Sequence, residues 1–274
     1  MSKKIILLGS KGMLGQMVKR FFFKEGYEII EYNKRFDENT IHNYIDLINS
    51  MESSVVINCI GRIKQKSDTA YDLLLSNTIF PLELSRCLKS DHLLIHPSTD
   101  CVFDGISKKP YTIKDKHTAV DVYGISKSLG ETALVSRPNT LILRVSIIGP
   151  DVNSSKGLLS WFLNNISHSE LNGYTNHLWN GITTLEWCEK LLHILQDQKL
   201  FKDLIEKKII QLGTVEVYSK YEMLLLFNRL FNKNFTIVPF QASTSINRCL
   251  KPELISMSLE TQIERLKSYM IDNF

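Results

Sequence analysis

A tyrosine and a lysine four residues apart have the types and spacing that acid–base chemistry requires. Tyr123 and Lys127 lie in the pentapeptide Tyr-Gly-Ile-Ser-Lys. Residues four apart share one face of a helix, so both side chains would point into one site. A phenol has an ordinary pKa of about 10, and a neighbouring ammonium lowers that pKa by favouring the phenolate. We therefore expect Lys127 to tune Tyr123 as a proton donor, although this spacing alone also fits a surface pair.

Hydroxyl side chains follow a buried strand that we expect at residues 93–97. Ser98, Thr99 and Asp100 come directly after it, and open α/β sheets bind their ligands at such carboxyl ends. A hydroxyl at this place can polarise a carbonyl group that Tyr123 protonates. Taken alone, Ser98 and Thr99 fit equally well with capping of the loop at the strand end.

Three glycines at the end of the first expected strand indicate a dinucleotide site. Residues 9–15 read Gly-Ser-Lys-Gly-Met-Leu-Gly. Glycine permits a sharp turn and a close approach of the backbone to a pyrophosphate, and the following helix N-terminus offers free N–H groups. The strand before it and the amphipathic helix after it favour this interpretation over a simple tight turn. The order of glycine loop, strand-end hydroxyl, tyrosine and lysine is more specific than any one of these features.

Cofactor choice depends on the residues at the end of the second expected strand. A carboxylate there favours a free ribose 2′-hydroxyl, and a basic residue accommodates a 2′-phosphate. Lys34 and Arg35 follow this strand, and Lys11 lies inside the glycine loop. These cations give a slight preference for NADPH, whereas Glu31 favours NADH. Lys34 and Arg35 also fit with solvated surface charges.

Apolar runs alternate with helical patterns through the first half of the chain. We expect strands at residues 3–8, 27–32, 55–59, 93–97 and 140–147, and helices at residues 13–24, 70–89 and 120–135. Continuous apolar strands separated by helices are typical of parallel β-α-β units covered on both faces. The sequence therefore predicts an α/β fold with a doubly wound parallel sheet of the Rossmann type.

The second half is less regular and predicts a smaller α/β lobe that binds substrate. We expect helices at residues 158–166, 184–195, 220–231 and 258–270, and short strands at residues 209–212 and 236–238. The expected domains are a dinucleotide-binding part at residues 1–149, joined by part of 180–213, and a substrate-binding lobe at residues 150–179 and 214–274.

Composition excludes several classes of protein. Apolar residues make up 43% and charged residues 23% of the 274 residues, which is ordinary for a globular chain and excludes disordered and fibrous architectures. The net charge of +4 is small for this length, so we expect no nucleic-acid partner. Five widely spaced cysteines and a short apolar run near the N-terminus predict a cytoplasmic protein without membrane insertion.

These motifs together resemble an extended short-chain dehydrogenase/reductase, and more narrowly the dTDP-4-dehydrorhamnose reductase family of sugar-nucleotide ketoreductases. The segments that carry the resemblance are residues 9–15, 56–61, Asn77, 98–105, 123–127 with Gly130 and Glu131, and 143–146. They cover the first half densely, and the second half matches only in length and layout.

The resemblance implies a catalytic trio. Thr99 would orient a sugar ketone, Tyr123 would be the general acid, and Lys127 would tune Tyr123 and hold the nicotinamide ribose. The implied activity is NAD(P)H-dependent reduction of the 4-keto group of a nucleotide-activated deoxysugar, for polysaccharide or deoxysugar synthesis. Two alternatives stay open: a sugar-nucleotide epimerase with tightly bound NAD, and a non-catalytic regulatory subunit that binds a dinucleotide, since relatives of the family include such subunits.

Further residues are implied in binding the two ligands. The expected cofactor residues, besides Tyr123 and Lys127, are Gly9, Lys11, Gly12, Met13, Leu14, Gly15, Lys34, Arg35, Asp37, Cys59, Ile60, Gly61 and Asn77. The expected substrate residues are Ser98, Asp100, Cys101, Ser146, Trp179 and Arg248. Asp37 lies near the family's adenine contact, and Asn77 has a structural alternative, which is to fix the geometry of the neighbouring strand end.

Two departures from the family pattern concern the sugar. Cys101 stands where the family usually has tyrosine, and Ser146 is followed by Ile147 rather than by an aromatic residue. In the family that the sequence resembles, a basic segment at the position of Arg248 meets the substrate diphosphate, so the resemblance implies this role for Arg248, whose planar fork suits phosphate. A solvated basic loop also fits this segment. Trp179 fits a stacking residue or, more simply, a buried loop anchor.

The sequence contains few signals for metal ligation or for assembly into oligomers. The seven histidines show no His-x-His or His-Glu-x-x-His spacing, and His92 and His96 flank an expected strand rather than sharing a helix face. We therefore expect no metal. The expected partner is a nucleotide-diphosphate sugar, and a homodimer is possible.

Overall fold

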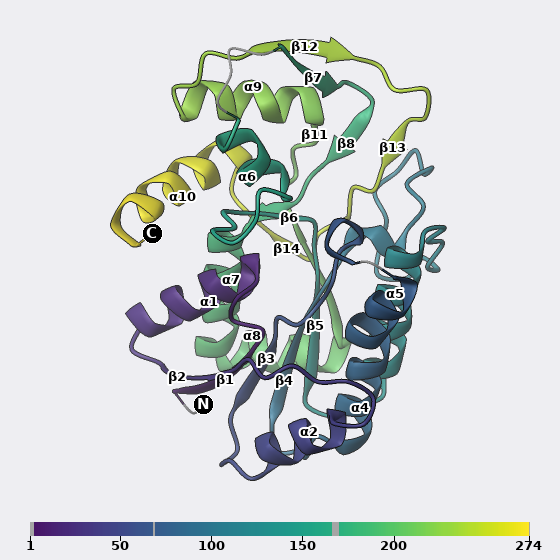
Figure 1. Cartoon of the computed structure of the whole chain (residues 1–274), viewed down its shortest axis with the longest axis vertical. Coiled ribbons are helices and arrows are strands. Elements are labelled where there is room, and N and C mark those ends of the chain that lie inside the picture. Colours follow the sequence, from purple (N-terminus) through teal and green to yellow (C-terminus); the bar gives the residue numbers. More distant parts are fainter. Residues whose placement is uncertain (1–2, 68, 166–169, 274) are drawn as a thin grey trace.

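A seven-stranded parallel sheet forms the centre of the computed structural model, which describes residues 3–67, 69–165 and 170–273. Its spatial order is β14-β10-β5-β4-β3-β1-β2 (Figure 1). The strands are β1 (Lys4–Leu8), β2 (Glu28–Tyr32), β3 (Val55–Asn58), β4 (Leu93–Ser98), β5 (Thr140–Arg144), β10 (Ile209–Gly213) and β14 (Leu254–Ile255). The order reverses between β1 and β3, as in a doubly wound Rossmann sheet, so the predicted fold class is confirmed.

Helices cover both faces of this sheet. One face carries α1 (Met13–Lys24), α7 (Thr184–Gln196) and α8 (Gln198–Lys207), and the other carries α2 (Ile41–Asn49), α4 (Phe80–Cys87) and α5 (Val122–Val135) (Figure 1). Side chains alternate along β1, so Ile5 and Leu7 enter the first hydrophobic core while Ile6 and Leu8 enter the second. Burial on both faces explains the unbroken apolar runs of the sequence.

A smaller lobe gathers at one end of the sheet, as Figure 1 shows. Its helices are α6 (Leu158–Leu163), α9 (Lys220–Leu230) and α10 (Leu259–Asn273), and its strands are β7 (Glu170–Tyr174), β8 (His177–Trp179), β11 (Tyr218–Ser219), β12 (Thr236–Phe240) and β13 (Ile246–Asn247). A further pair, β6 (Ile147–Ile148) with β9 (Ile182–Thr183), follows β5. No helix within the described ranges is long and apolar enough to cross a membrane.

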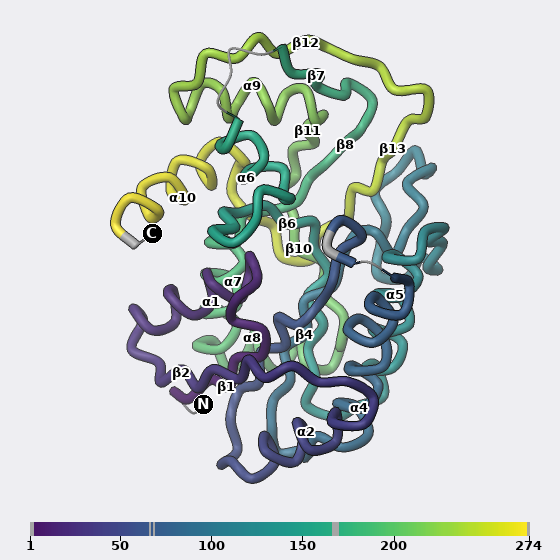
Figure 2. The backbone as a smooth tube through the Cα atoms, viewed as in Figure 1, coloured from purple at the N-terminus to yellow at the C-terminus, as the bar shows by residue number. Residues whose placement is uncertain are grey.

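The backbone passes between the two parts more than once. Figure 2 shows the chain leaving the central sheet for the lobe after β5 and re-entering it at β10. It enters the sheet a last time at β14, where Leu212 pairs with Leu254. The sheet therefore includes residues 254–255, from the segment that we assigned to the substrate lobe, and the domain boundaries stay a prediction.

Several elements differ from the expected ones. Helices α2 and α8 and most lobe strands were not expected from the sequence. The expected strand at residues 140–147 is divided into β5 and β6, because the chain leaves the sheet at residues 145–146. The expected helix at 158–166 ends at Leu163, and residue 166 lies outside the described residues.

The expected helix at residues 70–89 contains a wider turn. It consists of α3 (Ala70–Leu74), a π-helical turn at Leu75–Ile79 and α4. Such turns are frequent at functional sites, and this one contains Asn77. The Asn77 amide donates to the Arg62 carbonyl and to the Ser126 hydroxyl of α5. Helix α5 approaches closely at Gly130, where a Cβ atom would lie 2.1 Å from the Asn77 carbonyl oxygen.

A buried charge cluster joins α5 to three strands of the sheet. Glu131 of α5 pairs with Arg144 at the end of β5 at 2.6 Å, and both side chains are about 1% exposed. Arg144 also donates to Gln211 of β10, and Ser98 of β4 donates to Glu131. Burial alone would raise the pKa of Glu131, but hydrogen bonds from His117 and Arg144 lower it to about 2.

We expect Glu131→Gln to lower the free energy of unfolding by about 3–5 kcal/mol at pH 7, because it leaves Arg144 buried without a counter-charge. Urea unfolding followed by circular dichroism measures the change. The native carboxylate stabilises the fold above the unfolded pKa of about 4.5, and this contribution is lost as the pH falls toward about 2. The exposed Glu264→Gln is the matched control. A loss below 1 kcal/mol for Glu131→Gln would contradict the assigned role.

Candidate active site

The glycine loop has the geometry that a bound pyrophosphate requires. Gly9 has a φ angle of 76°, and a Cβ atom there would lie 2.9 Å from the Ile60 backbone nitrogen. A Cβ atom at Gly15 would lie 2.2 Å from the Gly9 carbonyl oxygen. Helix α1 starts after Gly12 with no side-chain cap and no acidic residue in its first turn. Its N-terminal N–H groups and the positive end of its dipole are therefore available to phosphate.

A charged hollow of about 420 Å³ lies beside this loop. Its lining residues are Ser10, Lys11, Gln16, Lys19, Arg20, Glu31, Val152 and Asn153. Glu31 near the end of β2 accepts from the Ser10 hydroxyl and pairs with Lys19 at 2.5 Å. The Lys19 hydrogen bond is the largest cause that lowers the pKa of Glu31. One carboxylate thus faces three cations, and Lys19 already neutralises it.

The loop after β2 is more exposed than the glycine loop. Lys34 and Arg35 lie on the surface, and neither lines the hollow beside the glycine loop. Asp37 accepts hydrogen bonds from the backbone and the hydroxyl of Thr40 and from the backbone of Asn39. This carboxylate therefore has a local structural role in the turn before α2.

Residues after β3 close the other side of the expected cofactor cleft. The Ile60 backbone nitrogen donates to the Asn58 side chain, and a Cβ atom at Gly61 would lie 3.3 Å from the Asn77 amide oxygen. Burial raises the pKa of the Cys59 thiol strongly, which keeps it protonated, while nearby Lys127 opposes this effect. The Asn77 side chain also bonds the Arg62 backbone at both its N–H and its carbonyl, and a part of Asn77 in cofactor binding stays a prediction.

Thr99 and Tyr123 meet where β4 ends and α5 begins. Thr99 follows β4 directly, and Tyr123 lies in the first turn of α5, whose N-cap residue Asp121 accepts from the Gly124 backbone. Burial raises the pKa of Tyr123, and a hydrogen bond with the Thr99 side chain partly offsets this rise. The expected lowering of this pKa by Lys127 is wrong for this structure, because the desolvation of the phenolate dominates. The phenol therefore stays protonated at neutral pH.

Lys127 lies one helical turn after Tyr123 and is buried. Its ammonium donates to the Pro97 carbonyl at 2.9 Å. Desolvation lowers its pKa to about 8, although Glu131 and Cys59 act in the opposite direction. The ammonium is thus held at the carboxyl end of β4, close to the loop after β3.

Cys101 and Arg248 lie next to each other beside Thr99. Thr99 donates its hydroxyl to Asp100 at 3.0 Å, and the Arg248 guanidinium lies 4.0 Å from the Cys101 sulfur. Arg248 also donates to the Phe103 carbonyl. Burial and Asp100 raise the pKa of Cys101 to about 12, so its thiol is no nucleophile at neutral pH. Ser98, in contrast, points into the buried cluster around Glu131.

The lobe contributes Trp179 and a lysine that sequence reasoning missed. The Trp179 ring is buried, and its N–H donates to the Ser146 hydroxyl at 2.9 Å. The Lys220 ammonium lies 5.6 Å from the centre of this ring. Burial lowers its pKa, while Asp100, Cys101 and Cys249 oppose that shift. The one sequence signal for Lys220 is its position after Ser219, the start of a Ser-x-x-Glu capping box.

A segment after β6 links the two sides of the cofactor cleft. Asn153 donates to the Lys11 carbonyl at 3.0 Å, and Lys156 donates to the Gln65 carbonyl. A Cβ atom at Gly157 would lie 3.7 Å from the Met13 sulfur. The sequence analysis placed this segment in the substrate-binding lobe without a binding role, since its composition carries no signal for these long-range contacts.

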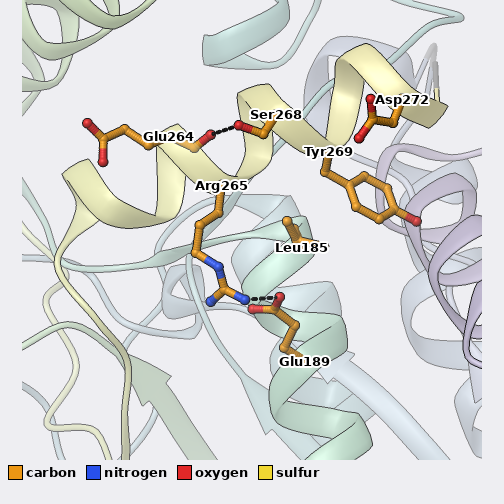
Figure 3. Close-up of a pocket in the computed structure, with 7 residues that line it drawn as sticks. All are labelled: Leu185, Glu189, Glu264, Arg265, Ser268, Tyr269 and Asp272. Carbon is orange, nitrogen blue, oxygen red and sulfur yellow. Dashed lines mark hydrogen bonds and ion pairs between the residues drawn. The ribbon is translucent and has the colours of Figure 1, made fainter.

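A second hollow, of about 410 Å³, lies between α7 and α10. Figure 3 shows Arg265 of α10 paired there with Glu189 of α7. None of its lining residues belongs to the expected site, and it lacks a glycine loop and a strand end. The charged hollow beside Gly9–Gly15 is therefore the better candidate for a cofactor site.

Comparison with known proteins agrees with this geometry. A dTDP-4-dehydrorhamnose reductase from Mycolicibacterium smegmatis is 26% identical over 155 residues, which are 53% of this chain and 46% of that protein. A dTDP-4-dehydrorhamnose reductase from Aggregatibacter actinomycetemcomitans is 28% identical over 153 residues, with 52% and 51% covered. The chain thus spans about half the length of the curated relatives that it matches.

The fold is shared over nearly the whole chain. The crystal structure of a dTDP-4-dehydrorhamnose reductase from Clostridium acetobutylicum superposes with a TM-score of 0.81 at 19% identity, covering 98% of this chain and 99% of that one. A family model described as the RmlD substrate binding domain matches residues 3–197. This match spans more than half of the chain and includes the glycine loop, Thr99, Tyr123 and Lys127. The chain therefore belongs to the RmlD substrate binding domain family.

Proposed function

We propose that this protein is an NAD(P)H-dependent reductase of the 4-keto group of a nucleotide-activated deoxysugar. The observation that carries the proposal is the meeting of Thr99 and Tyr123 at the carboxyl end of β4, with buried Lys127 one turn further along α5. The names of the relatives, which are dTDP-4-dehydrorhamnose reductases, support the same substrate class.

The side chains divide the work of ketone reduction. The glycine loop at residues 9–15 and Lys127 would hold a nicotinamide dinucleotide, which would supply the hydride for the carbonyl carbon. Tyr123 gives its phenolic proton to the carbonyl oxygen, so that the ketone becomes an alcohol. Burial favours this role, because it keeps the phenol protonated until the substrate oxygen gains charge. Thr99 would hold that oxygen, and Lys127, one turn further along α5, would hold the nicotinamide ribose.

We expect Tyr123→Phe to lower turnover by about 10²–10⁴-fold, since it removes the proton donor and leaves the cleft intact. NADPH oxidation with a 4-keto nucleotide sugar measures turnover, and fluorescence titration measures the dissociation constant of the cofactor, which should stay within about twofold. Tyr71→Phe, at an exposed tyrosine on α3, is the matched control. Unchanged turnover in Tyr123→Phe would refute the mechanism.

The pH profile should report the ionisation of Lys127. Its folded pKa is lowered to about 8, so the ammonium is present below this pH and is lost as the pH rises through it. We expect kcat/KM to fall about tenfold per pH unit above about 8. Lys127→Arg should move this fall to higher pH, because guanidinium stays protonated. If the fall of kcat/KM at alkaline pH is unchanged in Lys127→Arg, another group causes this fall.

On the substrate side, we propose that the lobe and the loop after β4 hold the sugar and its diphosphate. Arg248 and Lys220 place two cations around Cys101, which suits an anionic diphosphate. Asp100 and Cys101 would border the sugar. The hydrogen bond between Trp179 and Ser146 would fix the position of the ring beside Lys220, whereas Ser98 belongs to the buried cluster around Glu131.

For the cofactor, we propose a preference for NADPH over NADH. The hollow beside the glycine loop has Lys11, Lys19 and Arg20 against the single carboxylate Glu31. Because Lys19 pairs with Glu31, a net positive charge is left for a 2′-phosphate. A dTDP-4-dehydrorhamnose reductase from Bacillus anthracis with the same fold, at a TM-score of 0.79, 16% identity and 98% and 100% coverage, was solved in complex with NADP.

Lys11→Ala should weaken NADPH binding by about tenfold, equivalent to about 1.4 kcal/mol, because one charge-assisted phosphate contact is lost. NADH binding should change by less than about twofold. Isothermal titration with each cofactor gives both constants, and Lys199→Ala, on the surface of α8, controls for the loss of one positive charge. Equal losses for the two cofactors would contradict a 2′-phosphate site at Lys11.

Two rival activities remain distinguishable by simple measurements. A sugar-nucleotide epimerase would retain its NAD, so the absorption spectrum of the purified protein would show a bound dinucleotide and no added reductant would be needed. A regulatory subunit would oxidise no NADPH with any keto-sugar nucleotide. We also propose a cytoplasmic location, which suits the five unpaired cysteines of the structure, and a homodimer stays a prediction.

A further inference from the structure

Three side chains of different types converge on the outer side of α2 and α4. His42 lies on α2, and Glu83 and Cys87 lie four residues apart on α4. The His42 Nδ1 atom is 3.7 Å from the Glu83 Oε2 atom and 3.8 Å from the Cys87 sulfur. The Cys87 sulfur is 3.7 Å from the same Glu83 oxygen. Imidazole nitrogen, thiol sulfur and carboxylate oxygen thus form a nearly equilateral triangle.

These separations match the edges of a tetrahedral zinc site. Zinc binds nitrogen, oxygen and sulfur at about 2.0–2.3 Å, so a tetrahedral angle puts neighbouring donor atoms about 3.3–3.6 Å apart. The three observed distances exceed these values by a few tenths of an ångström. Small side-chain adjustments would therefore bring all three atoms into ligand positions, without movement of either helix.

The surroundings of Glu83 leave one of its oxygens for a ligand. Its side chain is about 10% exposed, and its Oε1 atom pairs with Arg86 at 3.1 Å. Its Oε2 atom faces His42 and Cys87 instead. Arg86 therefore holds the carboxylate in place from one side, as the partners of metal ligands commonly do.

We propose that His42, Glu83 and Cys87 bind a divalent zinc ion at the α2–α4 interface. Mixed nitrogen, sulfur and oxygen donors are typical of zinc, whereas calcium and magnesium prefer oxygen ligands alone. Asp46, one turn after His42 and close enough to Cys87 to influence its thiol electrostatically, or a water molecule completes the coordination. The histidine spacing within single segments did not predict this site, because its ligands come from two helices.

The zinc ion would lie outside the proposed active site and would have a structural role. Helix α2 starts at Ile41, directly after residues 33–40, which include Lys34, Arg35 and Asp37. Binding at His42 would tie the start of α2 to α4 and would thereby fix the end of this exposed loop. None of the three ligands lines the charged hollow beside the glycine loop, so zinc would stabilise the fold without taking part in the chemistry.

Cobalt substitution tests the site in the untagged full-length chain after treatment with a chelator. Addition of Co²⁺ should produce the near-ultraviolet charge-transfer band of a cobalt–thiolate bond and the strong visible bands of tetrahedral cobalt, at one equivalent. Cys87→Ser should remove the charge-transfer band. His42→Ala should weaken binding at least about tenfold. His193→Ala, an exposed histidine on α7, is the matched control and should leave the spectrum unchanged.

Thermal unfolding with Zn²⁺ supplies a second readout that does not depend on activity. Zinc in excess should raise the melting temperature by a few degrees, because it binds the folded chain preferentially. Glu83→Gln should abolish this rise. The proposal is overturned if Co²⁺ gives only the weak spectrum of octahedral cobalt, if Cys87→Ser keeps the charge-transfer band, or if Zn²⁺ stabilises wild type and Glu83→Gln equally.

Discussion

One buried carboxylate connects the elements that carry the proposed chemistry. Glu131 of α5 receives hydrogen bonds from Ser98 at the end of β4 and from Arg144 at the end of β5. Arg144 extends this connection to Gln211 of β10. Because Tyr123 and Lys127 lie on the same helix as Glu131, the position of the acid is set by a charge pair that water does not reach. A buried pair of this kind is costly to break from one side only, which gives the helix one defined position.

The site is assembled from strand ends that lie far apart in the sequence. Thr99 follows β4, the loop at Cys59 follows β3, and the glycine loop follows β1, which agrees with the rule for ligand sites in open parallel sheets. Burial shifts the pKa values of the two titratable side chains on α5 in opposite directions. Burial raises the pKa of Tyr123, which stays a neutral phenol, and lowers the pKa of Lys127 to about 8, near neutral pH. The raised pKa of Tyr123 suits a donor that must hold its proton until the substrate oxygen gains charge.

Most of the motif-bearing half of the fold was predictable because its elements are specified locally, although α2 was missed. Apolar strands, the glycine turn and the Tyr–Lys spacing lie within short segments, and the structure has each where the pattern indicates it. The lobe was less predictable, since β8, β11 and β13 are two or three residues long and are defined only by their partners. Lys220 and Asn153 were missed because their places in the site depend on contacts with residues far away in the sequence. The sign of the Tyr123 pKa shift also required the three-dimensional environment, because spacing cannot measure desolvation.

The strand order has a consequence for synthesis of the chain on the ribosome. β5 is buried along its whole length and lies between β4 and β10, but β10 follows it only after residues 145–208. Until β10 has emerged, one edge of β5 presents unpaired N–H and C=O groups beside apolar side chains, which is a template for aggregation. Arg144 at the end of the same strand would lack Gln211 during this interval. The nascent protein therefore passes through a vulnerable stage that ends only when the second half of the chain has joined the first.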